Sequence, residues 1–354
     1  MMKNVVFLIG IFLGIQLAQA QVVDFDSEAY SQQFKEDFQI YSKAYSEPVI
    51  SSYSYNLISG WNQTAKVLQP WAVRLEFIGG ATQNPDQNRF FDFNTQGFSN
   101  NIRLKNPENN QLPTALGGAT DQAFIYSVDG QVGQGGIVLQ QITVEQEIPV
   151  FDGVTTPGNS VPNAVPQLSL GLPLGTEVSA RFFPYFQYNG ATHNEFGLGV
   201  KHGLDQHISA IPDFLHWNVA ALFNGSRYNY EPNQFLDGED QDVRLSGSAF
   251  MLHSTFSADY KFVSFFVNAG YYNWTTRFSI LGTYRYTVEE GVYNGEEVFE
   301  VIDPVEIIEK AGGVQASAGL RFVIAKTLTL SSAYHIANKN TLTFGLGFRF
   351  GKEA

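Results

Sequence analysis

Residues 314–350 read VQASAGLRFVIAKTLTLSSAYHIANKNTLTFGLGFRF, and this stretch decides the fold. Apolar residues alternate with small or polar ones in three runs, which is the period of β-strands whose two faces meet different surroundings. The turns between the runs, Ala325-Lys326 and Asn338-Lys339-Asn340, are too short to hold a crossover helix, so the runs are antiparallel. A soluble sheet would carry more Lys, Glu and Asp on its second face, whereas Gly, Ser, Thr and scattered Arg suit a barrel lumen.

The same alternation recurs upstream. Its clearest examples are Trp71 to Phe77, Leu168 to Leu172, Val178 to Phe182, Phe196 to Val200, Trp217 to Phe223, and a hairpin from Phe250 to Tyr271. At roughly ten residues a strand, this predicts an all-β fold: a transmembrane antiparallel β-barrel of about 12 to 14 strands, formed by residues 70–354. Residues 86–150 are too irregular to divide into strands.

Composition supports the barrel. Charged residues make up 16% of the chain and aromatic residues 14%, whereas about a quarter of an ordinary soluble protein is charged. With no cysteine, disulfide scaffolds and lipid anchors on a cysteine are excluded. The net charge of -13 argues against a nucleic-acid partner, because phosphate binding needs clustered Lys and Arg. The expected partners are outer-membrane lipid and a small solute.

The N-terminus carries an export signal. Lys3 is followed by an apolar run from Val5 to Ile15 and then by Ala18-Gln19-Ala20, the pattern of a secretory signal peptide. The run is too short to span a membrane as a helix. We therefore expect residues 1–20 to be a signal peptide, cleaved after Ala20, and the mature chain to reside in the outer membrane of a Gram-negative bacterium.

Residues 21–69 have a helical period instead. Five aromatic residues share one helix face, and they are Tyr30, Phe34, Phe38, Tyr41 and Tyr45. Ser27 is a candidate cap at the start of the helix, and Pro48 is expected to end it. Two interpretations stay open: an amphipathic helix packed on a neighbour, and a plug in the mouth of the barrel.

Charged and imidazole side chains on the inward phase of the strands are candidates for lining the lumen. They are Arg74, Glu76, Arg181, Lys201, His253, Arg321, His335 and Arg349. The basic ones form either a ladder that attracts anions or, the commoner arrangement, pairs with Glu76, Glu177 and Glu195. The acidic run from Asp237 to Asp242 lacks the spacing of a calcium loop and is interpreted as solvated. We expect no metal and no other cofactor.

Three stretches carry a resemblance to a known family. Asn56 to Lys66, Phe196 to His202 and the closing aromatic strand resemble an uncharacterised outer-membrane β-barrel family of Bacteroidota. More distantly, a helical segment ahead of a large barrel is similar to the long-chain fatty-acid transporters, which pass hydrophobic molecules. The mature chain opens Gln21-Val22-Val23-Asp24 instead of their Asn-Pro-Ala start.

These features favour a porin-like passive channel or transporter for a small solute, hydrophobic solutes included, that acts through the lumen or a lateral opening. The alternative is a non-transporting barrel with a structural or surface-interaction role. A lipid hydrolase ranks third, because the six histidines occur without a G-x-S-x-G or H-E-x-x-H motif. The protein is therefore not expected to be an enzyme.

Overall fold

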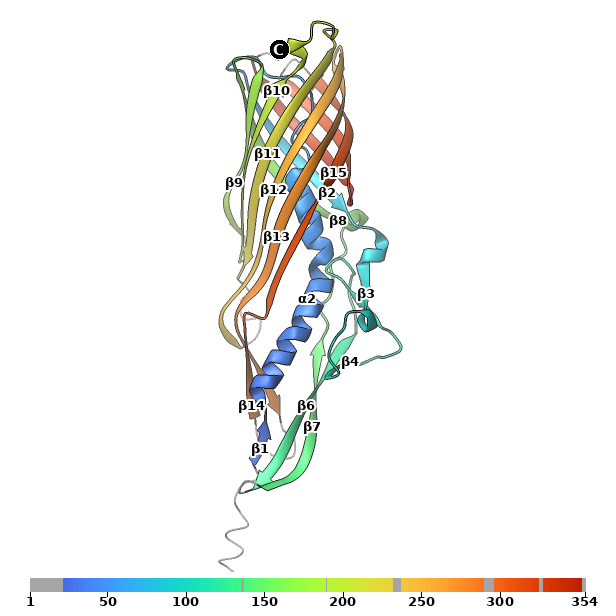
Figure 1. Ribbon diagram of the computed structural model, residues 1–354, viewed down its shortest axis with the longest axis vertical. Helices are drawn as coiled ribbons and strands as arrows, with labels where there is room; N and C mark the ends of the chain where they lie inside the picture. The colour runs from blue at the N-terminus through green and yellow to red at the C-terminus, as the bar shows by residue number, and fades with distance from the viewer. Residues whose placement is uncertain are drawn as a thin grey trace, which may run out of the picture.

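The computed structural model describes residues 22–134, 137–188, 190–231, 237–289, 296–324 and 327–351. The predicted signal peptide lies outside these ranges. The molecule consists of a β-barrel and an elongated head that extends from one end of it (Figure 1). The C-terminus lies at the opposite end of the barrel. Within the described residues, no helix is long and apolar enough to cross a membrane.

Ten antiparallel strands of the described residues close into a ring, in which β17 pairs with β2. They are β2 (Val73–Gln83), β8 (Ser160–Leu172), β9 (Thr176–Tyr188), β10 (Ala191–Gly203), β11 (Leu215–Tyr230), β12 (Gly238–Tyr260), β13 (Val263–Glu289), β15 (Val305–Ile324), β16 (Leu328–Ile336) and β17 (Thr341–Phe350). The predicted transmembrane antiparallel barrel is thereby confirmed. The ring has fewer strands than the 12 to 14 expected, because β12 and β13 use 23 and 27 residues and residues 84–159 lie outside it.

The outer face of the ring carries an apolar belt. On β12, the exposed side chains near the C-terminal end are Phe250, Leu252, Phe256 and Tyr260. At about 3.4 Å per residue and a tilt of about 40°, the stretch from Phe250 to Tyr260 crosses roughly 26 Å, the height of a membrane-spanning band. Beyond the belt, towards the head, the same face of the sheet becomes polar.

The head is built mainly from the insertion between β2 and β8. Its elements are β3 (Phe90–Asp92), β4 (Ile102–Leu104), β5 (Gln111–Pro113), β6 (Ala123–Gln134) and β7 (Ile137–Pro149), joined by β1 (Val22–Phe25) and by β14 (Glu296–Ile302). β6 pairs with β1, β4 and β7, and β14 pairs with the far end of β13. Short 3-10 helices cover Asp86–Arg89, Phe93–Thr95, Pro157–Asn159 and Asp205–His207.

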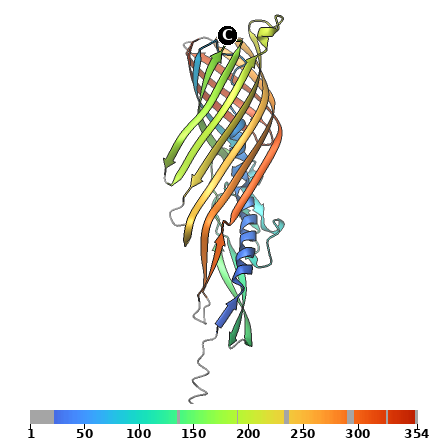
Figure 2. The same ribbon diagram turned by 60° about the vertical axis from the view of Figure 1, so that its left-hand side comes forward.

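Helix α2 (Ser27–Ile58) connects the head to the barrel (Figure 2). Its 32 residues make a rod about 48 Å long. The predicted boundaries were wrong at both ends: Asp26 caps the helix by accepting a hydrogen bond from the Ala29 amide at 3.0 Å, and the helix continues ten residues past Pro48. Lys339, in the turn before β17, contacts the helix at Pro48. Its Nζ donates to the Pro48 carbonyl at 3.4 Å and to Asn84 Oδ1 at 2.5 Å. Burial lowers the pKa of Lys339 below its ordinary value, and nearby Glu47 partly offsets this.

The first half of α2 packs on the head, as the amphipathic interpretation predicted. Tyr41 lies edge-on to Phe124 with ring centroids 5.2 Å apart, and Phe34 lies edge-on to Tyr126 at 5.4 Å. The Phe151 amide donates to the Tyr41 hydroxyl at 2.9 Å. Burial raises the pKa of Tyr41 well above its ordinary value.

The second half of α2 enters the barrel, as the plug interpretation predicted. Residues 51–60 are all buried, so the helix has protein on every side there. Ser52, Ser54 and Ser59 donate to the carbonyls four residues earlier, at 2.6, 2.9 and 2.8 Å. These bonds satisfy hydroxyl groups where water is excluded. Both interpretations of the N-terminal helix therefore apply, each to one half.

Candidate functional site

After α2, residues 59–69 continue through the lumen and contact strands from several sides. Asn62 Nδ2 lies 2.8 Å from His253 Nε2, and the Ala65 amide donates to Ser257 Oγ at 3.0 Å. From the opposite wall, Ser331 Oγ donates to Gln63 Oε1 at 2.5 Å. We call residues 50–69 the plug. The plug occupies the interior of the ring and forms hydrogen bonds with polar side chains of the surrounding strands.

Lumen-facing glycines allow the plug to approach the wall. A Cβ atom at Gly197 would lie 2.8 Å from the Trp61 ring, and one at Gly171 would lie 2.1 Å from the Gln69 carbonyl oxygen. The Arg181 guanidinium lies over the Trp61 ring, 4.1 Å from its centroid, a cation–π contact. The small residues that the sequence assigned to a lumen therefore serve close packing with the plug.

A buried ion-pair network holds the end of the plug that lies farther from the head. Glu177 contacts Arg74 Nη2 at 2.6 Å and Lys201 Nζ at 3.0 Å, and its second oxygen accepts from the Leu68 amide at 3.0 Å. Arg74 also contacts Glu76, at 3.1 Å. All of these side chains are nearly inaccessible to solvent, so each charge depends on its protein partners.

The structure places most of the predicted lumen residues inside the ring. Seven are buried, namely Arg74, Glu76, Arg181, Lys201, His253, Arg321 and His335. Arg349 is half-buried. Arg74 and Lys201 have carboxylate partners, the arrangement that the sequence favoured over an anion-attracting ladder. Arg181, Lys201 and His253 contact the plug, at Trp61, Lys66 and Asn62. His335 contacts Thr343 Oγ1 on the neighbouring strand at 3.0 Å.

The barrel wall is split between β8 and β9 on the side nearer the head. These strands pair only from Gln167 with Arg181 to Leu172 with Thr176. The remaining halves, residues 160–166 and 182–188, have no partner across this boundary in the described residues. Pro162, Pro166 and Pro184 lie in these halves, and proline lacks the amide that a strand ladder requires.

A cavity of about 730 Å³ lies behind the split. Helix α2 forms one side, with Val49, Tyr53 and Leu57, and the unpaired halves of β8 and β9 form another, with Ala164 and Phe186. The lining is mostly apolar and aromatic. Such a volume matches pockets for small molecules, which lie at about 300 to 1,000 Å³.

One wall of the cavity is an aromatic stack. The His193 ring lies between Phe183 and Tyr228, with centroids 4.9 and 4.2 Å away and nearly parallel planes. His193 Nε2 also contacts Ser226 Oγ at 3.1 Å. Glu195, a buried carboxylate that accepts from Asn224 Nδ2 at 2.9 Å, is the acidic group among the lining residues.

Sequence reasoning did not find this cavity. The plug half of α2 reads ISSYSYNLIS at residues 50–59 and has no apolar stripe, because every face meets a wall that is itself partly polar. The prolines at positions 162, 166 and 184 were the available signal, since proline inside an apolar alternation marks an unpaired edge.

The closed ring, the apolar belt and the occupied lumen define a membrane-spanning β-barrel that its own N-terminal segment fills. The chain belongs to a family of unknown function, DUF6588, whose model matches residues 2–350. A comparison with curated proteins found no match.

Solved structures of outer-membrane barrels resemble the chain at low identity. The attachment invasion locus protein Ail of Yersinia pestis is 11% identical, with 80% of this chain and 100% of that one covered and a TM-score of 0.28. The protease OmpT of Escherichia coli is 11% identical, with 80% and 98% covered and a TM-score of 0.29. The transport unit of the autotransporter AIDA-I from Escherichia coli is 10% identical, with 86% and 99% covered and a TM-score of 0.28.

Proposed function

We propose that the protein is an outer-membrane barrel that takes up a small apolar solute from the membrane through the split between β8 and β9. The observation that carries this proposal is the apolar cavity of about 730 Å³ directly behind the unpaired strand halves. The sequence favoured a passive channel or transporter for a small solute, hydrophobic solutes included, and we assign its lateral opening to the split. The Bacteroidota origin and the likeness to fatty-acid transporters stay predictions.

Entry from the membrane fits the surroundings of the split. The outward side chain of Phe182, beside the split, is more than half exposed, so the outer rim of the split is apolar at this point. The Asn56 side chain binds the wall beside the split, donating to the Val161 carbonyl at 3.1 Å and accepting from Thr82 Oγ1 on the neighbouring strand at 2.8 Å. It ties the helix to the β8 edge of the split, whereas residues 182–187 on the β9 edge make no hydrogen bond to the helix within the described part of the chain.

Passage through the centre of the ring requires the plug to move. The plug is anchored at Trp61 by cation–π contact and at Leu68 by the buried carboxylate of Glu177. We therefore assign the resting state to a barrel that is closed to water and hydrophilic solutes, with the apolar cavity open to the side.

The lengths of the connections orient the barrel. At the C-terminal end the strands are joined by residues 173–175, 204–214 and 261–262, whereas the insertion 84–159 and the β13–β14 extension lie at the other end. Barrels of this class have short periplasmic turns and long outer connections. The head is then outside the cell, and because Val22 pairs with Gly133 in the head, the plug runs from the outside inwards.

Photolabelling tests the solute site. A short alkyl diazirine is added to the protein in lipid vesicles, irradiated, and the labelled residues are mapped with and without excess unlabelled alkane. We expect saturable labelling of Tyr53, Phe183 and Phe186 and non-saturable labelling of the belt. Val49→Trp, which fills the cavity, should reduce the saturable labelling at least tenfold, whereas Ala180→Trp on the lipid-facing side of β9 should not.

A second arm tests the lateral route. Because the chain has no cysteine, Ala164→Cys can be modified alone with a bulky maleimide at the split, with Ala180→Cys as the matched control. After maleimide modification, slower diazirine photolabelling of the cavity in Ala164→Cys but not in Ala180→Cys supports lateral entry. Absence of any saturable cavity labelling in the folded wild-type protein contradicts the proposed function.

The second candidate function is surface interaction without transport, and the head favours it. Residues 84–159 contribute strands to two small sheets outside the ring, and their Leu112 and Phe124 share a core with Tyr41 of α2. If the head binds a partner, then deleting the exposed hairpin between β6 and β7 abolishes that binding without changing cavity labelling. In both candidate functions the protein acts without catalysing a reaction.

A further inference from the structure

A row of polar side chains crosses the outer face of the barrel just beyond the apolar belt. Strand register pairs Asn194 with Arg227, Arg227 with Ser246, and Ser246 with Arg277. Four adjacent strands, β10 to β13, thus contribute to one line, which we call the arginine row. With strands about 4.8 Å apart, the two arginine backbones lie about 10 Å from each other, with a serine between them.

From the arginine row towards the apolar belt, the outward side chains become less polar with each row. One step nearer the belt, Ser248 pairs with Thr275 and both present hydroxyl groups. One step further, Phe223 pairs with Phe250, and both rings are exposed on the belt. Charge, hydroxyl and apolar groups therefore follow one another at the boundary where lipid headgroups meet acyl chains.

The arginine row carries excess positive charge in a chain whose net charge is -13. Arg277 contacts Glu306 at 3.2 Å, but both side chains are more than half exposed, so this pair is weak. Arg227 has no acidic partner within the described ranges. Lys310 on β15, which pairs with Thr275 on β13, adds a further cation beside the row.

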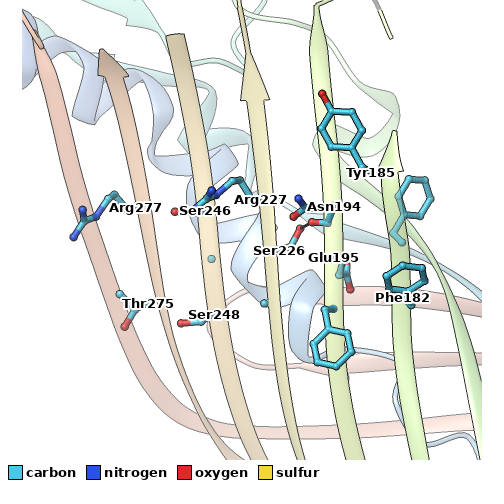
Figure 3. Close-up of a pocket in the computed structure, with 14 residues that line it drawn as sticks. Phe182, Tyr185, Asn194, Glu195, Ser226, Arg227, Ser246, Ser248, Thr275 and Arg277 are labelled. Atoms are coloured by element: carbon cyan, nitrogen blue, oxygen red, sulfur yellow. Dashed lines mark hydrogen bonds between the residues drawn. The ribbon is translucent and has the colours of Figure 1, made fainter. Parts of the chain in front are cut away.

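The two arginines of the row line a surface depression of about 710 Å³ together with Ser246, Ser248 and Thr275 (Figure 3). Arg227 and Arg277 lie on either side of Ser246, with Ser248 and Thr275 below them in this view. The apolar rings of Phe182 and Phe196 form another part of its lining and are 58% and 51% exposed. The depression therefore offers donors for an anion together with an apolar surface.

We propose that the arginine row binds the phosphate headgroup of an anionic membrane lipid, whose acyl chains lie on the belt at Phe223 and Phe250. Arginine binds phosphate through two parallel hydrogen bonds, and the hydroxyls of Ser246, Ser248 and Thr275 supply further donors. A lipid fits better than free phosphate because the donors adjoin the belt directly. This site goes beyond the proposed function and does not depend on the interior cavity.

Native mass spectrometry of the detergent-purified full chain tests the site, with phosphatidylglycerol and phosphatidylcholine of identical acyl chains as probes. Two surface cations favour an anionic lipid by about 30-fold in affinity. We expect a preference of this order for phosphatidylglycerol in the wild-type protein. Arg227→Gln/Arg277→Gln should abolish it, and Arg103→Gln, an exposed arginine in the head, should leave it unchanged.

Salt provides a readout that needs no variant, since the preference of the wild-type protein should fall as ionic strength rises. Equal retention of the two lipids by the wild-type protein would overturn the proposal, as would an unchanged preference in the folded double variant. Displacement of phosphatidylglycerol by excess inorganic phosphate would also overturn it, because the site would then be one for free anions.

Discussion

Replacing Glu177 with glutamine should strongly destabilise the barrel. The Glu177 carboxylate neutralises two buried cations, with contacts of 2.6 Å to Arg74 and 3.0 Å to Lys201, and it holds the plug through the Leu68 amide. Removing one partner of a buried ion pair typically costs about 3–5 kcal/mol, because the remaining charge stays buried without compensation. Glu177→Gln is therefore expected to lower the free energy of unfolding by about that amount.

The assay is equilibrium urea unfolding in lipid vesicles, followed by tryptophan fluorescence. Glu145→Gln is the matched control, because Glu145 pairs with Arg103 at 2.7 Å while both side chains are about half exposed, and exposed pairs contribute only about 0–1 kcal/mol. Adding Lys201→Met to Glu177→Gln removes one stranded cation and leaves Arg74 with Glu76. The double variant should regain at least about 1 kcal/mol over the single variant.

Two results would refute this reasoning. One is a folded Glu177→Gln protein whose stability lies within about 1 kcal/mol of the wild type, the level of an exposed pair. The other is a double variant less stable than the single one, which would mean that Lys201 contributes through its bond to the Lys66 carbonyl more than through its charge.

Further outcomes follow from the closed lumen and the orientation of the barrel. Val138→Cys in the head hairpin should react with a membrane-impermeant maleimide on intact cells, whereas Leu174→Cys, 84% exposed in a short turn, should react only after the outer membrane is permeabilised; the reverse pattern would invert the proposed orientation. Liposomes containing the wild-type protein should not swell in sugar solutions, because the plug fills the ring, and rapid swelling would show an open pore. Purified protein should release no fatty acid from phospholipid with Ca²⁺ present, because the Ser226 hydroxyl beside His193 donates its proton to the Asn194 carbonyl at 3.1 Å and is not held as a nucleophile. Hydrolysis that is lost in Ser226→Ala would instead identify Ser226 and His193 as catalytic.

The strands of the membrane belt were predictable because lipid imposes a simple rule on them. Where one face meets hydrocarbon, residues of the other phase must be small or polar, and Phe196-Gly197-Leu198-Gly199 in β10 shows this directly. The far half of β13 was not predictable in the same way. Asn273, Thr275 and Arg277 lie on the outer face there, whereas Tyr272 and Trp274 pack inside the ring, so the apolar residues change faces although the strand continues.

The phase of the strands assigned charged residues to the inner face, where the structure buries most of them, but it did not indicate what they contact. Sequence shows that Gly197 and Arg181 point inwards, and it does not show what they meet. The partner of both is Trp61, more than a hundred residues earlier in the chain. An open pore and a filled one require the same small and polar inner face, so only the three-dimensional structure distinguishes them.

The most direct test of the central claim is a crystal structure of the protein grown with a bromine-labelled alkane. We expect an anomalous bromine peak inside the wall, between Tyr53 on α2 and Phe183 on β9. Bromine peaks confined to the outer belt, in crystals where the cavity is otherwise well defined, would contradict it.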